Sequence, residues 1–213
     1  MAKLADAPAL GAGGGNPLEV QVLSSPQSNM MSKKSPFGEG KNWKLNACVG
    51  NNGGPYNYFD YACGYFQAGD ALAERLIQNS GFDMSMQIDA TIYPLLYLYR
   101  QGLELILKHF VNIDNVNASH DLTKLWSSCK TQVKDLLQNS YNKSDYTSSL
   151  KSIESFILKM QELDPSSMVS RFPEDKNKNN FLSDYSIINI EPIYVSARDF
   201  FGVMSYLVYS EQN

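Results

Sequence analysis

One segment of the chain, at about residues 89–111, is apolar around most of its circumference when it is drawn as a helix. Its apolar side chains recur at three- and four-residue steps, and two further leucines widen the stripe: Leu95, Tyr99, Leu103, Ile106 and Phe110, with Leu98 and Leu105. So wide an apolar surface predicts a central helix that packs on several neighbours. Pro94 falls in the first turns of this predicted helix, where a missing N–H costs least.

Four other segments also have helical periodicity. Helices are predicted at about residues 60–79, from Leu122 onward, at about 144–163 and at about 192–209. The first of these is expected to bury Tyr61, Tyr65, Ala68, Leu72 and Leu76. Between the last two, the polar residues 171–180 have turn composition and predict a short hairpin or loop. Five helices with short connections predict an all-α fold, a compact five-helix bundle.

Residues 1–29 differ from the remainder. They are rich in Ala, Gly and Pro, contain no aromatic residue and show no helical or strand period, which predicts a disordered tail before a helical domain of residues 30–213. Two pieces, residues 4–8 and 20–25, resemble the translation of a bacterial leucine transfer-RNA gene. One interpretation is a reading frame extended upstream through such a gene, with the true start at Met30 or Met31; the other is a flexible linker.

Charge and cysteine content narrow the classes of function. The net charge of −4 and the pI of about 5.2 argue against binding nucleic acid through a broadly basic surface, although a local basic patch stays open. Three widely spaced cysteines fit neither a disulfide framework nor a zinc site, and are typical of a reducing compartment. No stretch approaches the roughly 18 apolar residues of a membrane span, so a cytoplasmic protein without a membrane partner is expected.

Three charged residues interrupt the apolar helix. Arg100, Glu104 and Lys108 follow one another at four-residue steps, which places them on one face. They form either a structural charged network, because buried charges need partners, or the lining of a binding or catalytic cleft.

The turn before the third predicted helix carries His120 beside Asp121, a good capping residue. His120 can either hydrogen-bond Glu104 structurally or act as a general acid or base. The other histidine, His109, is eleven positions away, so neither a metal site nor a cofactor is expected.

Two stretches resemble the HEPN superfamily: residues 93–108, YPLLYLYRQGLELILK, and residues 120–126, HDLTKLW. They are most similar to bacterial HEPN-like proteins of uncharacterised function, in which a helix with an arginine, a glutamate and a lysine precedes a His-Asp-Leu turn. Residues 50–54, 61–68 and 171–175 also match that group, so the resemblance extends from Trp43 to nearly the C-terminus. It implies a helical bundle, often dimeric, from a superfamily rich in ribonucleases of toxin–antitoxin and antiviral systems.

The chain departs from the nuclease pattern of that superfamily, an arginine followed four to six residues later by a histidine. None of its arginines at 75, 100, 171 and 198 has a histidine at that spacing. The resemblance therefore favours a binding or interaction domain of a mobile-element or defence-associated protein. Its partner would be RNA or a protein from a neighbouring gene, with Lys108, Asp121 and Arg171 as binding candidates.

The alternative is a metal-independent ribonuclease with an unorthodox site. Arg100, Glu104 and His120 are its catalytic candidates: His120 would be the acid or base, while Arg100 and Lys108 stabilise developing charge. A buried Arg100–Glu104 pair would favour the binding domain, and an open cleft at a two-fold interface with both copies of His120 would favour the nuclease. A third option is an assembly partner that docks through an aromatic patch: Tyr194, Phe200, Tyr206 and Tyr209.

Overall fold

The computed structural model describes residues 41–50, 56–79, 85–111 and 119–210. The predicted tail at residues 1–29 lies outside these ranges, as does most of the glycine-rich stretch at residues 50–54. The chain divides into two compact units, residues 1–48 and 49–213. In the first unit the described element is η1 (Trp43–Leu45), a 3-10 turn whose Lys44 N–H donates to the side chain of Asn42.

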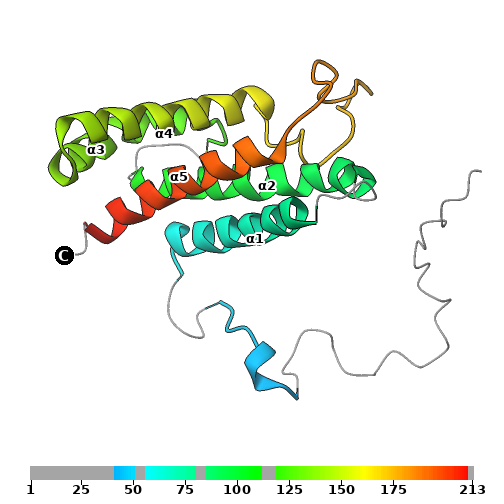
Figure 1. The fold of residues 1–213 in the computed structure, drawn as a ribbon, viewed down its shortest axis with the longest axis horizontal. Coiled ribbons are helices and arrows are strands. Elements are labelled where there is room, and N and C mark those ends of the chain that lie inside the picture. Colours follow the sequence, from blue (N-terminus) through cyan, green and yellow to red (C-terminus); the bar gives the residue numbers. More distant parts are fainter. Residues whose placement is uncertain (1–40, 51–55, 80–84, 112–118, 211–213) are drawn as a thin grey trace, which may run out of the picture. The chain divides into compact units, whose positions relative to one another are not determined.

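The described residues of the second unit form five α-helices, as the sequence predicted. They are α1 (Tyr58–Gln78), α2 (Ser85–Phe110), α3 (Leu122–Ser140), α4 (Lys143–Leu163) and α5 (Ile190–Ser210). Figure 1 shows α1 beside α2, α3 beside α4, and α5 running across them. The described residues contain no β-strand, only an isolated bridge between Glu174 and Asn180. The all-α prediction is confirmed.

Polar side chains cap the N-termini of α1, α3 and α4. The Asn57 side chain accepts from the backbone of Phe59 and Asp60, and the Asp60 carboxylate accepts from the Asn57 N–H, which completes a capping box at α1. Asp121 caps α3, and Asn142 caps α4. Only Tyr141 and Asn142 separate α3 from α4, so these two helices are antiparallel neighbours.

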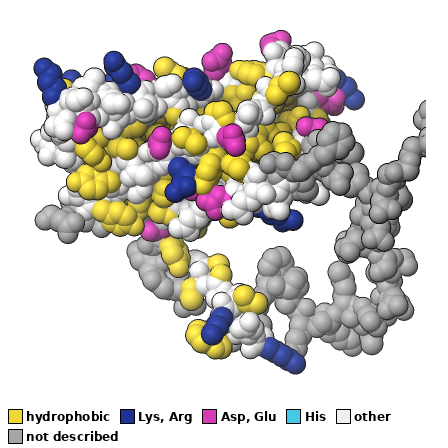
Figure 2. Space-filling view, viewed as in Figure 1, with side chains coloured by type: hydrophobic (Ala, Val, Ile, Leu, Met, Phe, Trp, Pro, Cys, Tyr) yellow, Lys and Arg dark blue, Asp and Glu magenta, His cyan; other side chains and the backbone are white. Residues whose placement is uncertain are grey.

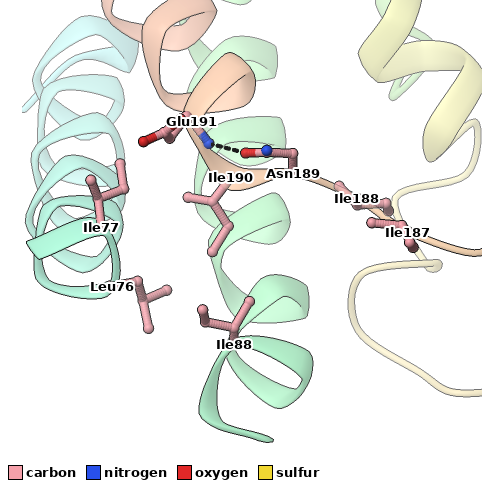
Figure 3. Close-up of a pocket in the computed structure, with 8 residues that line it drawn as sticks. All are labelled: Leu76, Ile77, Ile88, Ile187, Ile188, Asn189, Ile190 and Glu191. Carbon is pink, nitrogen blue, oxygen red and sulfur yellow. Dashed lines mark hydrogen bonds between the residues drawn. The ribbon is translucent and has the colours of Figure 1, made fainter. Parts of the chain in front are cut away.

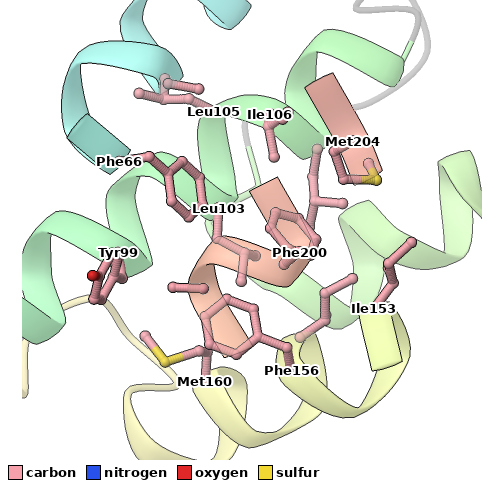
Figure 4. Close-up of a cluster of buried hydrophobic side chains, with 14 of the residues drawn as sticks. Phe66, Tyr99, Leu103, Leu105, Ile106, Ile153, Phe156, Met160, Phe200 and Met204 are labelled. Carbon is pink, nitrogen blue, oxygen red and sulfur yellow. The ribbon is translucent and has the colours of Figure 1, made fainter. Parts of the chain in front are cut away.

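The core lies around α2, as expected for a central helix. Leu95, Leu103 and Ile106 are fully buried, together with side chains from the other four helices. Aromatic rings fill the space between α1, α4 and α5: Phe66 stacks on Phe200, and Phe156 packs on Phe200 (Figure 4). Phe66 also stacks on Phe201. Ring pairs with such large buried area dominate the energetics of a core.

The predicted core face of α1 is right only in part: Leu76 is buried and Tyr65 and Leu72 are half-buried against the core, but the other two predicted residues are not. Tyr61 is 57% exposed and Ala68 is exposed, whereas the buried positions are Phe59, Ala62, Phe66, Gly69, Ala73 and Leu76. Both sets have three- and four-residue steps, so periodicity alone did not separate them. Gly69 lies against the Tyr99 ring of α2, where a larger residue would clash, and Tyr61 is left outside.

The predicted start of α2 is also wrong. The helix begins at Ser85, so Pro94 lies well inside it and not in its first turns. The missing N–H of Pro94 deprives the Ala90 carbonyl of its helical partner. Both residues are exposed, so water can serve that carbonyl and the helix continues.

The surface of the helical unit is mixed in character. On the face shown in Figure 2, acidic and basic side chains are interspersed among apolar ones. No described helix has the length and apolar character needed to cross a bilayer.

Candidate functional site

The charged residues of α2 form a network centred on Glu104. Arg100 Nη1 donates to Glu104 Oε2 at 3.0 Å, and Lys108 Nζ donates to Glu104 Oε1 at 2.7 Å. Arg100 is 0% exposed and Glu104 1%, whereas the Lys108 side chain is 17% exposed. Successive four-residue steps on one helical face bring the three groups together, as the sequence predicted.

Arg100 also connects α2 to two other elements. Its Nη2 donates to the backbone carbonyl of His120 at 2.6 Å, and its Nε donates to the carbonyl of Asp164 at 3.2 Å. These carbonyls lie immediately before α3 and immediately after α4. Every nitrogen of the guanidinium group therefore has a protein partner.

The charge state of Glu104 follows from its partners. Burial by itself would raise the pKa of this carboxyl, but the hydrogen bonds from Lys108 and His120 and the charges of Lys108 and Arg100 outweigh it. The net effect is a pKa below the ordinary value of 4.5, so Glu104 is an anion near neutral pH.

His120 is the most exposed part of this network. Its Nδ1 lies 2.8 Å from Glu104 Oε1, the hydrogen bond anticipated from the sequence, while 66% of its side chain is exposed. The neighbouring Asp121 acts as a helix cap: its Oδ1 accepts from the N–H groups of Thr123 and Lys124. The hydroxyl of Thr123, together with these backbone donors, lowers the pKa of Asp121.

Asp164 is a part of the network that the sequence did not predict. Its buried carboxylate accepts from the N–H groups of Met168, Val169 and Ser170 and from the Ser170 hydroxyl, at 2.8–3.3 Å. The order Asp164-Pro165-Ser166-Ser167 is a turn signal that could have suggested this role. Asp164 thus links Arg100, through its carbonyl, to the backbone that leads into Arg171.

Arg171 does not join the Glu104 network. Its guanidinium lies over the rings of Tyr97, at 6.0 Å from the centroid, and Phe172, at 5.3 Å. It lines a hollow of about 410 Å³ with residues from α2 and from the segment after α4: Tyr93, Ser170, Phe172, Pro173, Asn180 and Phe181. The sequence predicted Arg171 as a binding residue but gave no reason to place it on an aromatic surface.

A second concavity lies at the same end of the bundle and is mainly aliphatic (Figure 3). It has a volume of about 310 Å³ and is lined from α1, α2 and the segment that enters α5: Leu76, Ile77, Ile88, Ile187, Ile188, Asn189, Ile190 and Glu191. Residues 80–84, between α1 and α2, lie outside the described part of the chain, so the lining is given for the described residues alone.

A further polar cluster, also missed, connects α1, α2 and α5. The buried Tyr99 donates its hydroxyl to Asp70 at 2.9 Å, and burial raises the pKa of both side chains. Tyr194 donates to Glu74 at 2.6 Å and accepts from Arg198 at 2.7 Å.

The aromatic docking patch proposed from the sequence does not form as expected. Phe200 is buried in the core, and the Tyr194 hydroxyl is engaged by Glu74 and Arg198. Tyr206 and Tyr209 are exposed. Phe200 faces inward because it lies on the same helical stripe as Ala197, Met204 and Leu207.

Over the described ranges, no group of three or more His, Cys, Asp or Glu residues is arranged to hold a metal ion. Comparisons with known proteins give no relative for this chain: no family model matches it, and searches of curated proteins and of solved structures returned no significant match.

Proposed function

We propose that the chain is a HEPN-like helical binding domain in which the Glu104 network has a structural role. The observation that carries the proposal is the saturation of Arg100: its side chain is 0% exposed and each of its three nitrogens donates to a group of the protein. A group that stabilises charge on a substrate must reach that substrate, and Arg100 would first have to leave three partners.

The wider setting belongs to the same proposal. The resemblance to the HEPN superfamily supports a defence or mobile-element role, a cytoplasmic location, a homodimer, and RNA or a neighbouring gene's product as partner. The absence of the superfamily's arginine–histidine spacing supports binding over RNA cleavage. The dimer is tested by light scattering on the purified full chain.

The second candidate function, a ribonuclease, is favoured by the orientation of His120. A buried carboxylate that fixes one nitrogen of an exposed imidazole is the arrangement that orients a general base in hydrolytic sites. Lys108 lies on the same carboxylate and is partly exposed, so it could pair with a phosphate.

The two candidates are separated by incubating the purified full chain with total bacterial RNA and by following growth after induced expression. His120→Ala is the test variant because its side chain is exposed and its removal spares the carbonyl that Arg100 uses. A binding domain leaves RNA and growth unaffected in both proteins. RNA fragmentation by the parent chain, lost in a His120→Ala protein with an unchanged melting temperature, would overturn the proposal in favour of the nuclease.

A further inference from the structure

We infer that the segment leading into α5 binds an extended peptide strand of a partner protein, a strand in which apolar residues alternate with lysine or arginine. This segment, named here the pre-α5 segment, consists of residues 185–189. It lies outside every described helix and is followed by Ile190, the first residue of α5. The inference is argued from the apolar exposure of the segment, its open backbone groups and the charge around it. It does not depend on the Glu104 network or on the HEPN resemblance.

Ile187 is the most exposed large apolar side chain among the described residues. It is 88% exposed, and Tyr185, two positions earlier, is 43% exposed. A single exposed isoleucine needs no explanation, but this one borders hollows on several elements. Ile187 and Ile188 line concavities of about 310 Å³ with α1 and α2 (Figure 3), about 390 Å³ with α2, and about 290 Å³ with α4 and α5. An apolar ridge bordered by hollows provides places for the side chains of a partner.

The backbone of the pre-α5 segment is open between two fixed ends. Tyr185 N–H donates to the Leu182 carbonyl at 3.0 Å, and Glu191 N–H donates to the Asn189 side chain at 2.9 Å. Between them, the N–H and C=O groups of residues 186–188 have no hydrogen-bond partner in the described part of the chain. Such a row of open groups is a template to which an extended peptide adds as a strand. Because side chains alternate along a strand, every second one can enter the hollows.

Charge determines which strand fits. The charged residues that line these hollows are all exposed, and acidic ones are in excess: Asp89, Glu162 and Glu191 against Lys159. The three carboxylates form no ion pair with any other described residue. Complementary charge accelerates encounter, and like charge suppresses wrong partners. The surroundings therefore select a basic strand, and they disfavour both an acidic partner and a second copy of this segment.

The test is fluorescence anisotropy of two labelled seven-residue peptides, in which lysine alternates with valine or with isoleucine, titrated with the purified full chain. At least one should bind saturably, with a dissociation constant below about 100 μM. Three comparison peptides each lack one property: glutamate replaces lysine, serine replaces the apolar residue, or the whole backbone is N-methylated. Each should bind at least about tenfold more weakly than its parent peptide.

Two variants and one exchange measurement locate the site. Ile187→Ser should weaken peptide binding at least about tenfold with an unchanged melting temperature, because the side chain is exposed. Val49→Ser removes another apolar side chain, 75% exposed and outside these hollows, and should leave the affinity unchanged. In the free chain the amides of residues 186–188 should exchange rapidly with solvent hydrogen. Saturating peptide should slow at least one of them by about tenfold or more, because pairing gives it an acceptor.

The inference is overturned if neither lysine peptide reaches a dissociation constant of about 100 μM, or if Ile187→Ser and Val49→Ser bind equally well. It is also overturned if the peptide binds but leaves the amides of residues 186–188 unprotected. Light scattering covers the remaining occupant: a dimer of the parent chain that Ile187→Ser abolishes would assign the segment to a second copy instead. Failure here leaves the proposed binding domain standing, because RNA cleavage by His120 is the result that tests that proposal.

Discussion

Arg100 connects α2 to the start of α3 and to the end of α4 through hydrogen bonds to backbone carbonyls. Its three nitrogens donate to Glu104, the His120 carbonyl and the Asp164 carbonyl, and Arg100, Glu104 and Asp164 are buried. Breaking a buried pair from one side costs far more than the pair itself contributes, because the remaining charge stays buried without compensation. Removal of Arg100 would also leave the His120 and Asp164 carbonyls without this donor, which adds to the cost.

Arg100→Met should therefore lower the free energy of unfolding by about 3–5 kcal/mol, as measured by urea denaturation. In the double variant Arg100→Met/Glu104→Met, the loss should be smaller than the sum of the two single losses by about 1–3 kcal/mol. Arg75→Met, an exposed arginine on α1, is the control and should change stability by less than about 0.5 kcal/mol. Strictly additive losses would mean that Arg100 and Glu104 do not act as a pair.

Glu104 makes the stability of the network depend on pH in a defined direction. Its pKa is lowered in the folded chain, so its contribution is fully present above the unfolded value near 4.5 and is lost as the pH falls through the folded value. The free energy of unfolding of the parent chain should fall more steeply between about pH 5 and about pH 2 than that of Glu104→Gln. Asp121, Glu154 and Asp175 also have lowered pKa values, but they are common to both proteins and cancel in the comparison. Parallel pH profiles would show that Glu104 gains nothing from its partners.

At the scale of elements, the α1–α2 pair depends on two glycines. A Cβ at Gly69 would lie 2.7 Å from the Tyr99 ring, and a Cβ at Gly102 would lie 2.9 Å from the Phe66 ring. Both rings belong to the buried core, so neither can swing out of the way without disturbing its neighbours. The glycines are thus required by close helix approach, not by backbone conformation.

Gly69→Ala and Gly102→Ala should each destabilise the chain by about 1–3 kcal/mol in thermal or urea unfolding. The chain supplies its own controls, since a Cβ at Gly64 on α1 or Gly202 on α5 meets nothing within 4 Å. At those exposed helical positions alanine should stabilise by about 0.5–1 kcal/mol, because it removes the entropy cost of glycine. If all four variants shifted stability in the same direction, steric contact would not be the cause.

The elements were more predictable than their faces or their ends. Five helices were expected from apolar periodicity, and five are present in the part of the second unit that the structure describes. Periodicity identified the buried face of α1 only in part. Leu76 is buried as predicted, but two stripes with similar spacing pass through Tyr61 and Ala62, and which of them is buried depends on the contact with α2. The start of α2 was predicted too late, because proline usually occupies the first turn of a helix. Pro94 is tolerated inside α2, where the Ala90 carbonyl can face water.

The candidate site was predicted in the same uneven way. Four-residue spacing within one helix was enough to bring Arg100, Glu104 and Lys108 together, and a cap next to a histidine was enough to suggest His120. Asp164 lies 60 residues from Glu104 in sequence, and its role comes from a turn that forms only when α4 ends against α2. A contact that depends on tertiary structure leaves no period in the sequence.

At the scale of the whole molecule, hydrogen bonds connect the Glu104 network to the hollow that Arg171 lines. Arg100 holds the Asp164 carbonyl, the Asp164 carboxylate holds the backbone of residues 168–170, and Arg171 follows directly. The network can in this way determine the geometry of the segment that carries Arg171. Because of this connection, we expect a substitution of Arg100 or of Asp164 to loosen the backbone of residues 168–170, which lies outside any helix.

Native-state hydrogen exchange can detect that loosening residue by residue. In the parent chain the amides of Met168, Val169 and Ser170 should exchange slowly, although they lie outside any helix, because each donates to the Asp164 carboxylate. Asp164→Ala should accelerate all three at least about tenfold, and Arg100→Met should accelerate them more than the amides in the middle of α3. Amides of Val133 and its neighbours report global unfolding and serve as the internal reference. If Arg100→Met accelerated every amide by the same factor, Arg100 would contribute only global stability; if Asp164→Ala left the three amides protected, another contact would hold the segment that presents Arg171.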